Sequence, residues 1–131
     1  MRTPAQVSGD TAERLVAERL AREGWTILGR NVRVGRRELD LVAVDPHPPA
    51  AVVVVEVRWR RNRSFGLPEE TVDWRKRCRL REAALGLIDL GRLPDGREVP
   101  HLPLRIDIVV VEPGLAPDGA HRVRHHRFAV G

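Results

Sequence analysis

Cysteine is nearly absent from this sequence of 131 residues. Cys78 stands alone, so the chain can form neither an internal disulfide nor a cysteine-rich zinc site. Long apolar runs are missing as well. No stretch approaches the length of a membrane-spanning helix, and the residues after Met1 form no apolar segment of the signal-peptide type. We therefore expect a cytoplasmic protein without a membrane-embedded part.

Lysine is also nearly absent, although the chain is basic. Lys76 is the single lysine among 23 basic residues, and the formal net charge is +5. A basic balance favours a polyanionic partner, for which nucleic acid is the usual choice. The excess of arginine indicates a compositional bias, so each individual arginine carries less functional weight.

Internal repeats and composition shifts that would mark a domain boundary are absent. Apolar residues make up 42% of the chain and charged residues 31%, which is typical of a globular protein with one core. We expect a single domain over residues 1–131, in which residues 1–9 form a flexible arm.

Helical and strand periodicities alternate along the chain. They predict an α/β fold of α-β-β-β-α-β order, with a central mixed sheet flanked by helices. The predicted elements are a helix at 10–23, a strand at 25–34, a hairpin at 38–58, a helix at 71–90, a strand at 104–111 and a further strand at 122–130.

The predicted hairpin places acidic residues inside apolar strands. If its turn is centred near residues 47–49, the numbers of paired residues sum to about 96. Asp40 then faces Glu56, and Glu38 faces Arg58, all on one side of the sheet. Two carboxylates about 5 Å apart repel each other. A divalent cation between them would convert this repulsion into coordination.

Each of these candidates has an ordinary structural alternative. Glu38 and Arg58 could form a surface ion pair, with Asp40 and Glu56 simply solvated. Glu13 has capping-box spacing from the residue at position 10 and could serve only the helix start. Lys76 lies on the apolar stripe of its helix, where a lysine stem can pack while its charge reaches water.

Three arginines follow the hairpin closely, at Arg60, Arg61 and Arg63. In a loop flanked by Trp59 and Phe65, they could contact nucleic-acid phosphates while the aromatic rings stack on bases. The alternative is a solvated loop.

Taken together, these motifs resemble a known nuclease pattern. In this pattern an acid lies on the first helix and an aspartate on the second strand. The third strand carries a glutamate followed two residues later by a basic residue, and the next helix carries another basic residue. The pattern is that of the PD-(D/E)xK nucleases, which include restriction endonucleases and archaeal Holliday-junction resolvases. More closely, the chain resembles the bacterial YraN family over residues 9–111. The segments that carry the resemblance are Glu13, residues 24–31, 38–42, 55–58 and 65–66, Lys76, and residues 105–109.

The resemblance implies a single nuclease-like domain, a restriction-endonuclease-like sandwich with one catalytic metal site. Asp40 and Glu56 would bind Mg²⁺ or Mn²⁺, joined by the backbone carbonyl of Val57. Glu13 would approach from the helix, directly or through a water, and Lys76 would lie near the same cleft. The implied activity is metal-dependent cleavage of structured or single-stranded DNA, in repair or recombination.

The chain departs from the family pattern at three positions. Ala12 and Arg37 replace glycines, and Arg58 stands where the nucleases have lysine. Arginine stays charged and cannot act as a base, although it can stabilise developing negative charge. The alternative function is therefore a nucleic-acid-binding module with weakened or lost catalysis, and a less favoured one is a protein-interaction domain. We expect DNA rather than RNA as the nucleic-acid partner. The sequence leaves the oligomeric state open, and a homodimer is one of the alternatives.

Overall fold

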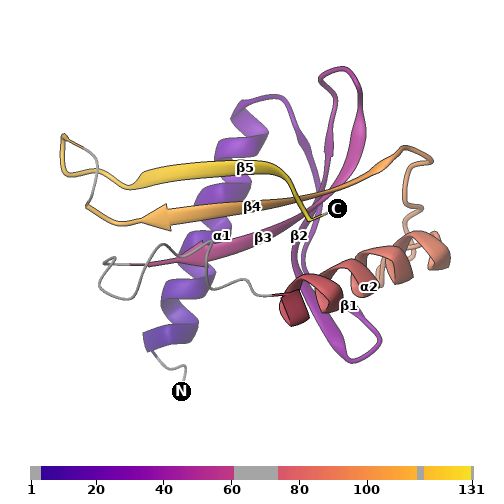
Figure 1. Cartoon of the computed structure of the whole chain (residues 1–131). Helices are drawn as coiled ribbons and strands as arrows, with labels where there is room; N and C mark the ends of the chain where they lie inside the picture. The colour runs from indigo at the N-terminus through magenta and orange to yellow at the C-terminus, as the bar shows by residue number, and fades with distance from the viewer. Residues whose placement is uncertain (1–3, 61–73, 115–116, 131) are drawn as a thin grey trace.

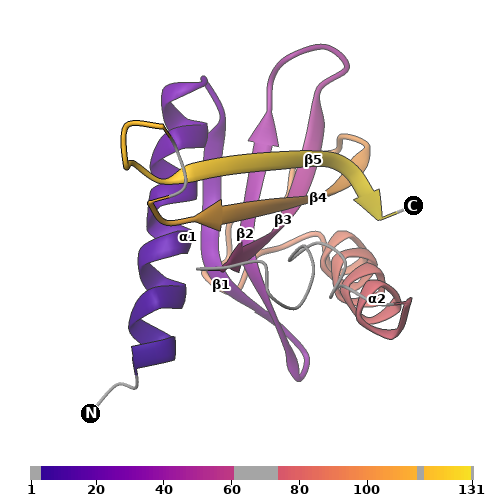
Figure 2. The same cartoon turned by 60° about the vertical axis from the view of Figure 1, so that its left-hand side comes forward.

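A five-stranded sheet lies between two helices in the computed structural model (Figures 1 and 2). The structure describes residues 4–60, 74–114 and 117–130. Neither helix in this part of the chain is long and apolar enough to cross a membrane. The elements are α1 (Pro4–Arg22), β1 (Thr26–Val34), β2 (Arg37–Asp45), β3 (Ala51–Trp59), α2 (Trp74–Leu90), β4 (Leu104–Glu112) and β5 (Arg122–Val130).

The strands lie in the order β1-β2-β3-β4-β5. β3 and β4 run parallel, and the other neighbours are antiparallel. A parallel pair needs a long crossover connection, and α2 lies within the one that joins β3 to β4. The expected α/β fold with a mixed sheet and two helices is confirmed, and β5 extends the sheet beyond β4.

The helices cover opposite faces of the sheet, as Figure 2 shows. Because side chains alternate along a strand, odd-numbered residues of β3 face α1 and even-numbered ones face α2. The α2 face contains the apolar stripe predicted from the helical periodicity. The stripe residues buried there are Leu80, Ala83, Ala84 and Leu87, and α1 buries Ala12, Val16, Ala17 and Leu20 on the other face.

The first helix begins earlier than its apolar stripe indicated. It starts at Pro4, so residues 4–9 are helical rather than part of a loose arm. Position 10 then lies inside the helix, and the capping-box interpretation of Glu13 is wrong. The end of the helix is as expected, because Gly24 adopts φ +92°, a left-handed conformation that glycine accepts easily.

The hairpin register agrees with the prediction, since the pairs from Leu41↔Val55 to Asp45↔Ala51 all sum to 96. Beyond Leu41 and Val55 the two strands separate. β2 stays paired with β1 as far as Arg37, which belongs to the strand rather than to the preceding turn. β3 stays paired with β4 as far as Trp59, which likewise ends a strand rather than beginning a loop.

A network of buried charged side chains lies on the α1 face of the sheet, at β4. Arg105 contacts Asp45 Oδ2 at 2.9 Å and Asp107 Oδ1 at 3.0 Å, and His125 Nε2 lies 2.8 Å from Asp107 Oδ2. The Arg105 guanidinium also lies 5.3 Å from the centre of the Trp25 ring. The Asp107 side chain is fully buried, so its charge depends on these partners. Hydrogen bonds from His125 and Arg105 lower its pKa even though burial acts in the opposite direction.

Removing Arg105 should therefore be costly. Arg105→Ala leaves the buried carboxylate of Asp107 with His125 and that of Asp45 with the half-exposed Arg127 at 3.7 Å, and we expect it to lower the free energy of unfolding by about 3–5 kcal/mol. Urea denaturation of both proteins measures this. The control Arg14→Ala, which changes an exposed arginine of α1, should stay within about 0.5 kcal/mol of the unmodified protein. Equal effects of the two substitutions would show that the network does not stabilise the fold.

Candidate functional site

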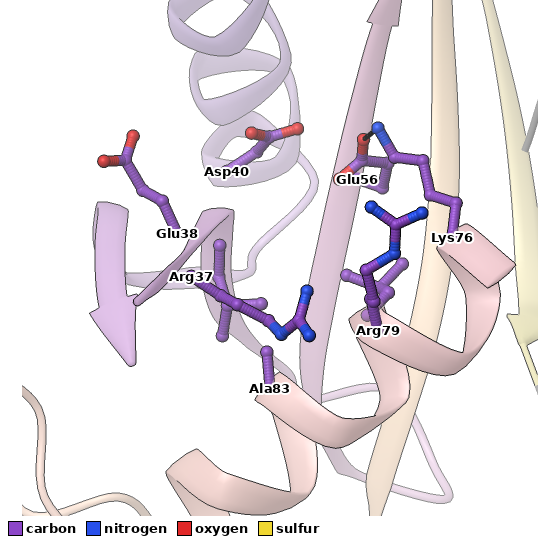
Figure 3. Close-up of a pocket in the computed structure, with 9 residues that line it drawn as sticks. Arg37, Glu38, Asp40, Glu56, Lys76, Arg79 and Ala83 are labelled. Atoms are coloured by element: carbon purple, nitrogen blue, oxygen red, sulfur yellow. Dashed lines mark ion pairs between the residues drawn. The ribbon is translucent and has the colours of Figure 1, made fainter. Parts of the chain in front are cut away.

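A cleft of about 230 Å³ opens where β2 and β3 separate, with α2 forming its other wall (Figure 3). The strands supply acids, while α2 and the start of β2 supply cations. Opposite charges therefore face each other across a small space. The cleft is lined by Arg37, Glu38, Leu39, Asp40, Glu56, Lys76, Arg79, Leu80 and Ala83.

Asp40 and Glu56 lie one step beyond the last residue pair of β2 and β3, as the hairpin register requires. Only 8% of Glu56 is exposed. Asp40 Oδ2 accepts a hydrogen bond of 2.9 Å from the backbone N–H of Val57, which satisfies a donor that the separating strands leave unpaired. Burial and the adjacent Glu56 carboxylate raise the pKa of Asp40 to about 8, although the Val57 bond acts in the opposite direction. The fold therefore favours the protonated form of Asp40.

Two cations approach the same oxygen of Glu56. Lys76 Nζ lies 3.1 Å from Glu56 Oε1, and Arg58 Nε lies 3.9 Å from it. The only lysine of the chain therefore reaches from α2 to the third strand, as Figure 3 shows. The alternative pairing of Arg58 with Glu38 is wrong, because Glu38 has Arg33 as its cationic partner at 3.8 Å.

Glu13 joins the site from α1 through Asn31. In the amide orientation that its hydrogen bonding requires, Asn31 donates to Glu13 Oε2 at 2.9 Å and to Glu38 Oε1 at 3.1 Å. Burial raises the pKa of Glu13, with the charge of Arg30 acting against it. Glu13 also contributes to the raised pKa of Asp40, so both helices supply side chains that act on the carboxylate pair.

No site role was predicted for Asn31, Arg37 or Arg79 from the sequence. Asn31 has φ +50°, and asparagine is one of the few non-glycine residues that adopt this conformation readily. A polar asparagine within a predicted strand was the available signal. No sequence pattern indicated that Arg37 and Arg79 belong to one site, because only the separation of β2 from β3 places them at the same cleft.

The arginine loop lies largely outside the described residues. Arg61 and Arg63 are not among them. Arg60 is exposed at the end of β3, where its backbone N–H donates to Val111 O at 3.0 Å and its Nη1 to Trp59 O at 3.1 Å. The phosphate-contacting role of these three arginines stays a prediction.

The donor set is suited to a magnesium-like ion bound in part by water and substrate. Across residues 4–60, 74–114 and 117–130, no group of three or more histidine, cysteine, aspartate and glutamate side chains is arranged to hold a metal. Mg²⁺ commonly takes only one or two carboxylates, several waters and substrate phosphates. Asp40 and Glu56 match that requirement, and their mutual repulsion is a physical reason for a cation to bind there. Coordination by the Val57 carbonyl stays a prediction.

Fold and site together define a mixed α/β protein in which a half-buried aspartate and a buried glutamate lie in a cleft that also carries cations. Residues 12–111 match the Uncharacterised protein family UPF0102, and the chain belongs to this family. This confirms the family part of the resemblance to the YraN proteins.

Relatives in the family cover most of the chain. UPF0102 protein STH1475 of Symbiobacterium thermophilum is 44% identical over 116 residues, which are 88% of this chain and 89% of that protein. A UPF0102 protein of Stutzerimonas stutzeri is 40% identical over 115 residues, 87% and 89% of the two chains. UPF0102 protein BL0935 of Bifidobacterium longum is 37% identical over 109 residues, 83% and 82%.

Among solved structures, that of Pyrococcus furiosus SfsA in complex with Ca²⁺ matches 97% of this chain at 16% identity. The TM-score is 0.38, and the chain spans 65% of that protein's length. A likeness this weak supports no argument about fold or function.

The raised pKa of Asp40 predicts how metal-free stability changes with pH. In the unfolded chain Asp40 ionises near its ordinary pKa of 3.8, whereas in the fold it keeps its proton up to about 8. The folded state therefore binds more protons in this window, and its contribution to stability falls as the pH rises through it. Asp40→Asn removes the cost of ionisation and can still accept the Val57 hydrogen bond.

We expect Asp40→Asn to raise the melting temperature by at least about 3 °C at pH 9 and to have little effect near pH 4. Thermal unfolding in EDTA at both pH values measures this. As a control, Asp95→Asn changes an exposed aspartate whose pKa is lowered rather than raised. It should not reproduce the gain at high pH. A pH-independent effect of Asp40→Asn would contradict the assigned repulsion.

Proposed function

We propose that this protein is a metal-dependent nuclease with a restriction-endonuclease-like fold, acting on structured or single-stranded DNA in repair or recombination. The observation that carries the proposal is the pair of the half-buried Asp40 and the buried Glu56, which lie where β2 and β3 separate, in a cleft that Lys76 also lines. Two carboxylates held side by side and largely out of water cost stability, and acids perturbed in this way in a cleft mark a candidate functional site.

In this proposal Asp40 and Glu56, joined by the Val57 carbonyl, hold Mg²⁺ or Mn²⁺. When bound, the ion would polarise the scissile phosphate and lower the pKa of the water that attacks this phosphate. Asp40 would release its proton to solvent in order to serve as a ligand. Lys76 Nζ lies 3.1 Å from the Glu56 oxygen, so its ammonium group lies within reach of a phosphate or water bound at the same place.

Arg58 supplies charge and no proton chemistry. Its guanidinium is a planar group of hydrogen-bond donors that would stabilise negative charge developing on the phosphate. Lys76 has the compact ammonium group that the nuclease pattern places on the third strand. We infer that Lys76 and Arg58 divide between them the work of that strand lysine.

A second candidate function is a DNA-binding module of the same fold without efficient cleavage. Arg58 favours this alternative, since arginine replaces the lysine of active nucleases. The basic net charge suits both functions equally. Metal binding alone does not separate them, because a binding module could retain the ion. Cleavage separates them.

Metal binding can be tested through stability. A ligand that binds only the folded state stabilises it, by about 2.7 kcal/mol at 100 times its Kd. We expect Mn²⁺ to raise the melting temperature of the unmodified protein and to lose this effect in Asp40→Asn. Arg58→Ala serves as a matched variant that should keep the Mn²⁺ effect. An equal rise in the unmodified protein and Asp40→Asn would place the metal elsewhere.

Cleavage should be assayed with Mg²⁺ and Mn²⁺ on branched, flapped and single-stranded DNA. We expect slow or narrowly specific cutting that Asp40→Ala abolishes. If Arg58 limits the rate, Arg58→Lys should cut at least as fast with unchanged metal binding, while Arg58→Ala should cut more slowly. If neither the unmodified protein nor Arg58→Lys cuts any DNA or RNA while both bind it, the binding-module function replaces the nuclease.

A further inference from the structure

We propose that Arg37 and Arg79 form a phosphate-binding wall that draws an unpaired nucleic-acid strand into the cleft. This inference rests on the proposed function and deepens it, because it names single-stranded nucleic acid as the form that reaches the acids. The two arginines come from different elements, Arg37 from the start of β2 and Arg79 from α2. Figure 3 shows both guanidinium groups at the same cleft as Asp40 and Glu56.

Arg79 lies three residues after Lys76, so both side chains emerge on the same face of α2. Lys76 reaches Glu56, and Arg79 extends the cationic edge by one helical turn. Residues of one helix face at this spacing lie about 5–6 Å apart at their Cβ atoms. The helix therefore offers a row of cations beside the carboxylate pair.

Arg37 is held only weakly in its present position. Its ion-pair partner is Glu82 at 3.7 Å, and the two side chains are 44% and 72% exposed. Exposed pairs of this kind contribute about 0–1 kcal/mol, so a phosphate can displace Glu82 at little cost. A guanidinium fork matches two phosphate oxygens and makes shorter, stronger hydrogen bonds than neutral donors do.

The acids at the cleft already have partners of their own. Lys76 and Arg58 contact Glu56, and Arg33 and Asn31 contact Glu38. Neutralising these acids therefore does not require Arg37 or Arg79. Their place at the cleft is better explained by an incoming anion.

The size of the cleft favours an unpaired strand. Its volume of about 230 Å³ is below the roughly 300–1,000 Å³ of sites that enclose a drug-sized ligand, and Glu56 at its base is only 8% exposed. In a duplex each phosphate is held on a wide, stiff double helix, whose backbone bends only at a cost in free energy. A single strand can bend its backbone into a cationic groove.

Binding can be measured without metal or cleavage, by fluorescence anisotropy in EDTA with a labelled single-stranded oligonucleotide and the matching blunt duplex. For single strands, log K falls with log salt concentration by about 0.7 per phosphate contact. We expect Arg37→Ala and Arg79→Ala each to reduce this slope by about 0.7, and the double variant by about 1.4. The controls Arg36→Ala and Arg81→Ala remove exposed neighbours that do not line the cleft, and should leave the slope unchanged.

Unchanged slopes in the two cleft variants would overturn the inference, as would tighter binding of the duplex than of the single strand. A melting temperature within about 2 °C of the unmodified protein shows that a variant is folded and its slope interpretable. If the slopes fall as expected but the unmodified protein cuts nothing, the inference stands and the nuclease proposal fails. If Asp40-dependent cleavage occurs while both cleft variants bind normally, the nuclease stands and this inference fails.

Discussion

The repulsion between Asp40 and Glu56 is the constraint around which the rest of the cleft is arranged. Each strand keeps its ladder on the outer side, β2 with β1 and β3 with β4, so the strands can separate at this point with few broken hydrogen bonds. The backbone N–H of Val57 is taken up by Asp40 itself. Lys76 balances Glu56, and a retained proton neutralises Asp40. Each of these three interactions lowers the cost of placing the two acids side by side, and a divalent cation can take over that role.

The opposite face of the sheet shows how this fold treats a charge that serves stability alone. There Arg105 is enclosed between Asp45 and Asp107, with His125 on the far oxygen of Asp107. Each acid has a cationic or hydrogen-bonding partner, and the side chains are buried. The network lowers the pKa of Asp107, whereas burial beside Glu56 raises that of Asp40. The pKa values of Asp107 and Asp40 thus shift in opposite directions, and Asp40 lines a cleft together with Glu56.

Much of this arrangement follows from local sequence. The turn residues predicted the register of the hairpin, and this register placed Asp40 opposite Glu56. Helical periodicity placed Lys76 on the inner stripe of its helix, and the resemblance to the nuclease pattern implied its position near the two acids. The early start of α1 was less visible, because the apolar stripe begins only at Ala12; Pro4, at the first helical position that proline favours, was the local signal. The parts that could not be predicted depend on tertiary structure. Arg37 and Arg79 line the same cleft, and Asn31 contacts Glu13, only because the strands separate and both helices pack at that end of the sheet.

The replacement of lysine by Arg58 takes on a different meaning once Lys76 is placed. A nuclease needs at this position a cation close to the reacting phosphate, and the proposed mechanism also uses a group that can hold a water or move a proton. Arg58 meets only the first need. Lys76 lies closer to Glu56 than Arg58 does, at 3.1 Å against 3.9 Å, and its side chain is 40% exposed where that of Arg58 is 15% exposed. The more accessible of the two cations therefore comes from α2. In a chain with a single lysine, the contact of that lysine with Glu56 is the strongest argument for the proposed role of the site.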